Sequence, residues 1–198
     1  MTRPEHPRMT LSEFLVWEDG TDTRYHLIEG QPVPIPIEYV LHGEIMANLC
    51  LATQPFATPW KPLPSFGVVP PHRPETIYIA DFLVTAARLD GRAQFRHEPR
   101  IIFEILSPGT AVIDHCLKIP DLREIPSVTD IVLISMHAYR AEHWRREGGS
   151  WRVACKSRDD AIEFADPGVS IAVDSIYGYG GLLPSNVAYM PPEPIFAS

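Results

Sequence analysis

The chain has 198 residues, 45% of them hydrophobic and 21% charged, and its formal net charge at pH 7 is −8. This composition predicts one soluble globular domain with enough apolar material for a core, and it excludes a mainly disordered chain. The acidic balance argues against tight, unspecific binding of nucleic acid. Any contact with DNA or RNA therefore has to be local or assisted by a metal ion.

The proline and cysteine contents narrow the class of protein further. The 21 prolines are about twice the usual share of ~5%, and seven of them fall between residues 55 and 74. The three cysteines form no paired motif, which predicts a reduced, cytoplasmic protein. The start of the chain has no apolar signal core, and no apolar run approaches the ~18 residues of a membrane span. We therefore expect neither export nor a membrane partner.

The first quarter of the chain predicts a short helix, a hairpin and a long helix. Thr10 and Glu13 have the spacing of a capping box, which favours a helix over residues 10–17. Residues 24–36 have a Glu-Gly turn between two apolar stretches, as in a β-hairpin, and its prolines favour an edge position for the second arm. Residues 39–53 carry apolar side chains at helical spacing and predict the longest helix.

The rest of the chain predicts a buried sheet. Residues 55–74 leave room for at most one short strand between stiff, proline-rich connections. Three segments are apolar almost throughout, as is typical of central strands: residues 76–84, 100–106 and 130–136. Residues 110–122 are expected to form a helix, and residues 141–156 an antiparallel hairpin. Residues 184–198 are rich in proline without periodicity and are expected to form a tail.

Two acidic residues lie inside the apolar strands, Asp81 in the first and Glu104 in the second. A buried carboxylate is costly unless it is paired, protonated or bound to a cation. If the two strands are neighbours, a divalent ion such as Mg²⁺ between the carboxylates would satisfy both. The alternative is structural, with each acid accepting hydrogen bonds from a loop or pairing with an arginine.

Lys118 follows Glu104 by fourteen residues and lies on the helix that is expected to pack back over the sheet, so it could reach both acids. Alternatively, it forms a solvent-facing ion pair with Asp114, four residues earlier, worth only ~0.3–0.5 kcal/mol. Pro120 has no backbone N–H, so it is expected to kink this helix or to start a new turn.

Taken in order, these residues resemble the Uma2 family, also called DUF820, of the PD-(D/E)xK nuclease superfamily. The resemblance rests on the order and spacing of short motifs: Leu11 to Glu18, Arg24 to Gly30, Ile79 to Asp81, Phe103 to Pro108, Asp114 with Lys118, and Ile125 to Ile134. It implies one α/β (α+β) domain over residues 10–183. This domain would have a restriction-endonuclease-like core, a mixed central sheet flanked by helices, an extra N-terminal hairpin and a C-terminal β meander.

The resemblance also implies chemistry. Asp81 and Glu104 match the acids that bind Mg²⁺ or Mn²⁺, and Lys118 is a substitute for the superfamily's strand lysine, whose position is taken by Leu106. The expected function is Mg²⁺-dependent hydrolysis of phosphodiester bonds in nucleic acid, DNA in preference to RNA, by a protein that could act as a homodimer. The alternative is a relative that has lost catalysis and keeps the fold as a binding or assembly module.

Two histidines are second-rank candidates for lining the site. His26 stands where related sequences have glutamate, and it could either ligate a metal or be a structural residue of the hairpin. His42 matches a histidine that is common in the family, although it could also lie on the helix surface beside Glu44.

Overall fold

The structure, a computed structural model, describes residues 6–88, 91–96, 98–107 and 113–178. Its largest element is a seven-stranded sheet made of β3 (Lys61–Val68), β4 (Tyr78–Thr85), β5 (Phe95–Arg96), β6 (Ile101–Leu106), β7 (Asp130–Ser135), β8 (Arg140–Glu147) and β9 (Ser150–Ser157). The order across the sheet is β5-β3-β4-β6-β7-β8-β9. The β3–β5 and β6–β7 pairs are parallel and the others antiparallel, so the sheet is mixed, as the sequence predicts.

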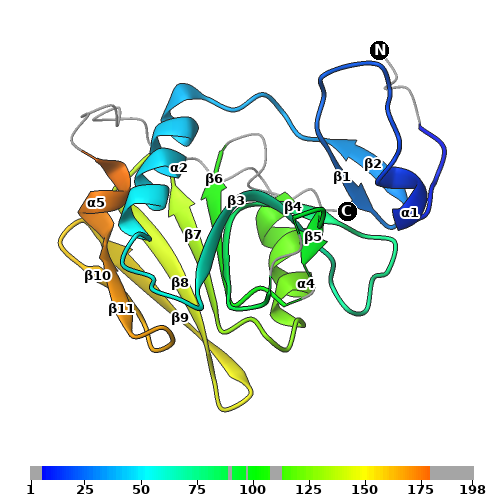
Figure 1. Ribbon diagram of the computed structural model, residues 1–198. Coiled ribbons are helices and arrows are strands. Elements are labelled where there is room, and N and C mark those ends of the chain that lie inside the picture. Colours follow the sequence, from blue (N-terminus) through cyan, green and yellow to red (C-terminus); the bar gives the residue numbers. More distant parts are fainter. Residues whose placement is uncertain (1–5, 89–90, 97, 108–112, 179–198) are drawn as a thin grey trace, which may run out of the picture.

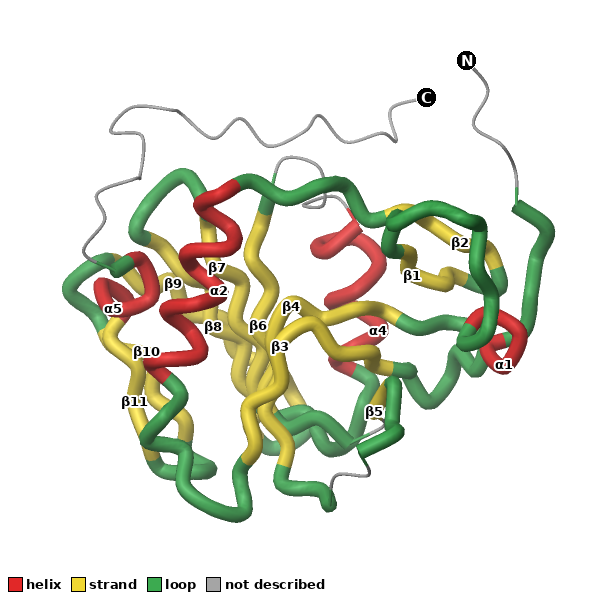
Figure 2. Tube along the Cα trace, turned by 45° about the horizontal axis from the view of Figure 1, so that its top comes forward, coloured by secondary structure: helices red, strands yellow, loops and turns green. Residues whose placement is uncertain are grey.

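Different elements cover the two faces of this sheet (Figure 1 and Figure 2). One face carries α2 (Val40–Ala52), a small antiparallel sheet of β10 (Ala161–Phe164) and β11 (Val169–Ala172), and the short α5 (Val173–Tyr177). The other face carries the π-helical turn η1 (Asp114–Lys118) and α4 (Ile119–Arg123). Helices on both faces explain why the central strands are apolar throughout.

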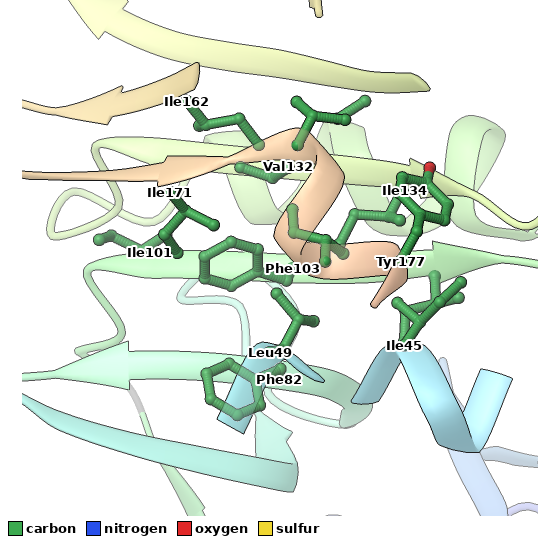
Figure 3. Close-up of a cluster of buried hydrophobic side chains, with 14 of the residues drawn as sticks. Ile45, Leu49, Phe82, Ile101, Phe103, Val132, Ile134, Ile162, Ile171 and Tyr177 are labelled. Carbon is green, nitrogen blue, oxygen red and sulfur yellow. The ribbon is translucent and has the colours of Figure 1, made fainter. Parts of the chain in front are cut away.

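The core divides along the sheet into two apolar layers. Ile45 and Leu49, one turn apart on α2, pack against Phe82 of β4 and Phe103 of β6 (Figure 3). On the opposite face, Ile119 and Leu122 of α4 pack against a second set of strand residues, including Ile102 and Leu133. Side chains alternate along a strand, so the odd positions of β6 face α2 and the even positions face α4. Glu104, at an even position, belongs to the α4 face.

The N-terminal segment forms a separate hairpin beside the sheet, as predicted (Figure 1). Strands β1 (Tyr25–Ile28) and β2 (Gln31–Pro34) pair around a turn in which Glu29 and Gly30 both have positive φ angles of 50° and 78°. That backbone matches the twist of a two-residue hairpin loop. Helix α1 (Leu11–Phe14) begins with the predicted capping box, and a β-bridge from Leu27 to Ile77 joins the hairpin to the segment before β4.

The proline-rich segment forms a longer strand than predicted. The eight residues of β3 include Pro62 and Pro64, whereas the sequence indicated at most one short strand there. Strand β4 pairs with one edge of β3, and β5 reaches only Gly67 and Val68 on the other. The two prolines therefore lie where β3 has a free edge, and their missing N–H groups leave no strand partner unsatisfied.

The predicted helix over residues 110–122 is interrupted in its structure. The part that the structure describes begins with the π turn η1, in which Ile119 N–H donates to Asp114 O, and continues as α4. Pro120 lies in the first turn of α4, where proline is tolerated. The sequence thus predicted a new turn at Pro120 correctly, but it gave no sign of the wider π turn before it.

Two features were not predicted, and one prediction lies outside the described part of the chain. The β10–β11 pair and α5 complete the cover over the α2 face, although residues 158–177 had no assigned structure in the sequence. The expected tail at residues 184–198 lies outside the described residues. No helix among the described residues is long and apolar enough to span a membrane.

Candidate active site

Strand β4 separates from both neighbouring strands at Asp81. The β3–β4 register has pairs on either side of this residue but none at it, and the β4–β6 register begins at Phe82. The alternation of side chains changes here as well, because Ala80 packs in the α4 layer and Phe82 in the α2 layer. Across from Asp81, Ser65 of β3 has a φ of 49°, a strained value for a non-glycine residue. Asp81 therefore lies where the sheet opens.

Side-chain contacts replace the missing main-chain pairing between β4 and β6. The Asp81 Oδ2 atom accepts a hydrogen bond of 2.7 Å from Ile105 N–H, and Asp81 N–H donates to Glu104 Oε2 over 3.4 Å. The side chain of Asp81 is a quarter exposed. Its position is thus fixed by the sheet, while part of the carboxylate stays accessible.

Glu104 lies directly behind this opening and is completely buried. Its Oε2 atom accepts a hydrogen bond of 2.8 Å from Lys118 Nζ. Its Oε1 atom is buried and accepts no hydrogen bond from any residue that the structure describes. A buried oxygen without a partner is uncommon in native proteins and asks for an explanation such as an absent ion or water.

The π turn brings two charged residues onto the same buried face. Asp114 and Lys118 both point inward, and the residues between them are more exposed. The Lys118 Nζ atom lies 3.2 Å from Asp114 Oδ1 and donates to Ile79 O over 3.3 Å, in addition to its bond to Glu104. The alternative of a solvent-facing ion pair is therefore wrong. The pair with Asp114 forms, but both side chains are 3% exposed.

His42 reaches the same opening from the other face of the sheet. It is buried on α2, with Nε2 lying 3.3 Å from Asp81 Oδ1, at ion-pair distance but without the alignment of a hydrogen bond. The alternative of a helix-surface residue is wrong, because α2 presents this side of the helix to the sheet edge. Asp81 and Glu38 raise the pKa of His42 above its usual value, although burial opposes this shift.

His26 is buried in the hairpin, close to the site. Its Nδ1 atom accepts a hydrogen bond of 3.0 Å from Ile79 N–H, so this nitrogen carries no proton and is not free for a metal. Burial, together with the charge of Lys118, lowers the pKa of His26 to about 3. The imidazole is therefore neutral at physiological pH and joins β1 to β4, which agrees with the structural alternative.

The acids and the lysine shift each other's titration. Burial raises the pKa of Glu104 to about 8, with Lys118 opposing the shift. Burial alone would lower the pKa of Lys118, but Glu104 and Asp114 outweigh it and raise that pKa. The pKa of Asp81 stays below its usual value, because the contacts with His42 and Lys118 outweigh the effect of burial. The site therefore combines an ionised aspartate, a cationic lysine and a glutamate of raised proton affinity.

A small cavity of about 50 Å³ opens at this point. Four of the five residues selected from the sequence line it, and Glu104 contacts two of the lining residues. The full lining is Arg24, His26, Ile35, Glu38, His42, Ser65, Ile79, Asp81, Asp114 and Lys118. Sequence reasoning missed Arg24, Glu38 and Ser65. Glu38 had one usable signal, its spacing of four residues before His42.

The donor atoms suit a hard divalent cation. Asp81 and Glu104 come from adjacent strands and are joined by the hydrogen bond from Asp81 N–H to Glu104 Oε2, and Glu104 Oε1 is a buried acceptor without a partner among the described residues. Mg²⁺ prefers such oxygen ligands and usually retains several waters. In the part of the chain that the structure describes, no three histidine, cysteine or acidic side chains gather closely enough to hold an ion alone. The residues thus fit an ion with few protein ligands, whose other ligands would be water or phosphate oxygen.

Comparison with known proteins gives matches of three kinds. The family model Uma2, described as "Putative restriction endonuclease", matches residues 11–172. An uncharacterized protein of Synechocystis sp., slr1290, is 29% identical over 99 residues, which are 49% of this chain and 52% of that protein. The chain thus matches about half the length of this curated relative. The crystal structure of a putative nuclease of DUF820 from Anabaena variabilis has a TM-score of 0.61 and 18% identity, covering 85% of this chain and 97% of the other.

These matches support two different conclusions, one about the fold and one about the family. The structural neighbour has low sequence identity, so it establishes the fold and confirms the predicted restriction-endonuclease-like core. The family model covers most of the chain, and its residues include the β4, β6 and η1 positions that meet at the cavity. The chain belongs to the Uma2 family.

Proposed function

We propose that the chain is an endonuclease that hydrolyses phosphodiester bonds of nucleic acid, DNA in preference to RNA, with Mg²⁺ as its cofactor. The observation that carries the proposal is the meeting of Asp81, Glu104 and Lys118, from three different elements, beside a cavity. Lys118 Nζ lies 2.8 Å from Glu104 Oε2, and Asp81 N–H lies 3.4 Å from the same oxygen. Family membership supports the same reaction class.

Asp81 and Glu104 would hold the metal ion. The accessible part of the Asp81 carboxylate and the unpartnered Oε1 atom of Glu104 are the oxygens available for it. When bound, Mg²⁺ supplies a water of lowered pKa and positive charge for the phosphate oxygens. Because Glu104 has a raised proton affinity in the metal-free site, its carboxyl group has to lose any proton before it can act as a ligand.

Lys118 would supply a fixed positive charge beside the reacting phosphate. Glu104 and Asp114 hold its amino group at 2.8 and 3.2 Å and keep it protonated. An ammonium group in a buried, low-dielectric site stabilises developing negative charge more strongly than one in water. Asp114 acts through Lys118 and is therefore a positioning residue.

The cellular setting is part of the proposal. Cys50, Cys116 and Cys155 are exposed free thiols, which is consistent with a reducing cytoplasm. A two-fold dimer would suit cleavage of both strands of a duplex.

A plasmid-nicking assay with Mg²⁺ or Mn²⁺ tests this function. We expect wild-type protein to nick the plasmid and Asp81→Asn or Glu104→Gln to reduce the rate about a hundredfold or more, because each removes a charged metal ligand. Asp130→Asn, a buried carboxylate on the same sheet, is the matched control and should keep activity per folded molecule. Absence of cleavage of both the plasmid and single-stranded DNA by wild type with either metal, or equal cleavage by all variants, would overturn the proposal.

One observation favours a second function. Lys118 already pairs with both Glu104 and Asp114 through its amino group, so the buried group can also serve as a structural unit. A relative that kept this unit without cleaving would act as a binding or assembly module. Wild-type protein that binds nucleic acid equally with EDTA and with Mg²⁺, and never nicks it, would support this function.

A further inference from the structure

Besides Lys118, the cavity is lined by a second cation, Arg24. It is exposed, immediately precedes β1 and lines the cavity together with Asp81 and Lys118. Its side chain takes part in no ion pair within the described ranges, whereas Lys118 is engaged by two carboxylates and a carbonyl oxygen. An unpaired guanidinium beside acids that suit a metal ion is a ready binding group for a phosphate.

The adjoining segment has exposed apolar side chains next to the residues that line the cavity. Ile37 is 98% exposed and Tyr39 is 61% exposed, and Glu38 between them lines the cavity. The segment begins beside Arg24, because Ile35 N–H donates to Arg24 O over 2.7 Å. It then crosses from the hairpin to α2, as the ribbon and the tube views show (Figure 1 and Figure 2). Arg24 and the flanking residues Ile37 and Tyr39 thus lie on two adjoining segments beside the cavity, and together we call them the Arg24 rim.

The composition of this rim suits unpaired nucleotides. Proteins bind single strands by combining a basic group for the backbone with aromatic or apolar side chains for exposed base faces. In a duplex, the faces of the bases are covered by stacking and would not be available to Ile37 or Tyr39. A duplex also carries twice the charge of one strand per length, so a chain of net charge −8 repels it more strongly.

We propose that the Arg24 rim binds an unpaired stretch of DNA, with Arg24 on a phosphate and Ile37 and Tyr39 against the bases. This inference rests on the proposed function, since it takes the bound strand to be the one that is cut. It assigns a substrate class, single-stranded or locally opened DNA, that the family description does not specify.

Binding and cleavage are measured separately to test it. Fluorescence anisotropy in EDTA, using Asp81→Asn protein, compares a labelled 20-nucleotide single strand with the same sequence as a duplex. We expect tighter binding of the single strand. Arg24→Gln should weaken it and make the slope of log affinity against log salt less steep by ~0.7, the value for one phosphate contact on a single strand. Tyr39→Ala should weaken binding about fivefold or more, and Tyr39→Phe should restore it.

Matched controls separate the rim from general surface effects. Arg88→Gln removes another exposed arginine, and Val16→Ser removes an exposed aliphatic side chain for comparison with Ile37→Ser. Both controls should bind like the parent protein. Duplex binding as tight as single-strand binding, or rim variants that bind no more weakly than the controls, would overturn the inference.

The inference and the proposed function can fail independently. Single-strand binding that depends on the rim, without cleavage of any DNA by wild type, contradicts the nuclease but supports the rim as a binding surface. Cleavage that depends on Asp81 and Glu104, with rim variants cutting and binding like the controls, contradicts only the rim.

Discussion

The sheet contains two groups of buried charges that differ in one respect. Glu104, Lys118 and Asp114 meet at the opening between β4 and β6. At the start of β7, Asp130 Oδ1 lies 2.7 Å from His143 Nε2 and 3.4 Å from Arg145 Nε. The carboxylates of both groups are buried and paired. Burial and ion pairing alone therefore do not separate a functional group from a structural one.

The difference lies in what remains unsatisfied. Glu104 keeps a buried oxygen without a partner among the described residues, and its neighbours line a cavity. The Asp130 carboxylate has no such orphaned oxygen, and Asp130 does not line that cavity. A network with satisfied groups stabilises the fold, whereas one with an open acceptor beside a cavity can bind something further.

Among single substitutions in the two groups, replacing Lys118 should lower the free energy of unfolding the most. In Lys118→Met, Glu104 and Asp114 lose their shared cation while remaining buried, and we expect a loss of about 3–5 kcal/mol in the free energy of unfolding. Urea denaturation measures it. Adding Glu104→Gln should recover part of this loss but no cleavage. A single variant as stable as wild type would mean that the lysine charge is not needed to balance these acids.

Removing His143 should affect stability alone. In His143→Ala, Asp130 keeps Arg145 but loses its shortest contact, and the expected loss is about 1.5–3 kcal/mol. The nicking rate per folded molecule should equal that of wild type. A lower nicking rate in a correctly folded His143→Ala protein would contradict the assignment of the Asp130 group to stability alone.

Mg²⁺ should bind and stabilise the protein at the Glu104 group and not at the Asp130 group. At a concentration ten times its dissociation constant, a ligand of the native state adds about 1.4 kcal/mol of stability, or roughly 3–6 °C in Tm for a chain of this size. Thermal scans should show this shift in wild type and in His143→Ala but not in Asp81→Asn. The same shift in Asp81→Asn would place the ion elsewhere.

Lowering the pH should destabilise the protein through His26, and this is the smallest of the expected effects. Its folded pKa of about 3 lies below the ordinary value of 6.5, so the unfolded chain takes up a proton first as the pH falls. Stability is therefore full above pH 6.5 and declines towards pH 3, with a loss of about 0.8 kcal/mol already at pH 6. Urea denaturation of wild type and His26→Gln at pH 7.5 and 6 measures the difference. Identical pH dependence would contradict a buried neutral imidazole.

The sequence predicted the structural elements that are determined by residues close together in the chain. The capping box of Thr10 and Glu13 and the Glu29-Gly30 turn involve neighbouring residues only, and both form. The β3 strand was underestimated because prolines argue against pairing, and only the sheet order reveals that Pro62 and Pro64 lie on a free edge. The β10–β11 pair gave too weak a local signal, and it is stabilised by packing on the α2 face.

The site was predicted where a residue conflicted with its surroundings. Asp81 and Glu104 were noticeable because each is an acid in an apolar strand. Arg24 and Glu38 gave no such conflict, because charged residues in an exposed loop are ordinary, and only the tertiary structure brings them to the cavity. His42 could be read as surface or site, and the side of α2 that faces the sheet decides the matter.

In the π turn η1, the positions of Asp114 and Lys118 depend more on the number of residues between them than on the identity of those residues. Cys116 and Leu117 are exposed between the two inward-pointing charges, so replacing either with a polar residue changes few buried contacts. Deleting either one would remove the extra residue that distinguishes a π turn from an α-helix and rotate Lys118 away from Glu104. Among natural relatives, this short stretch should therefore vary freely in composition while keeping a constant length.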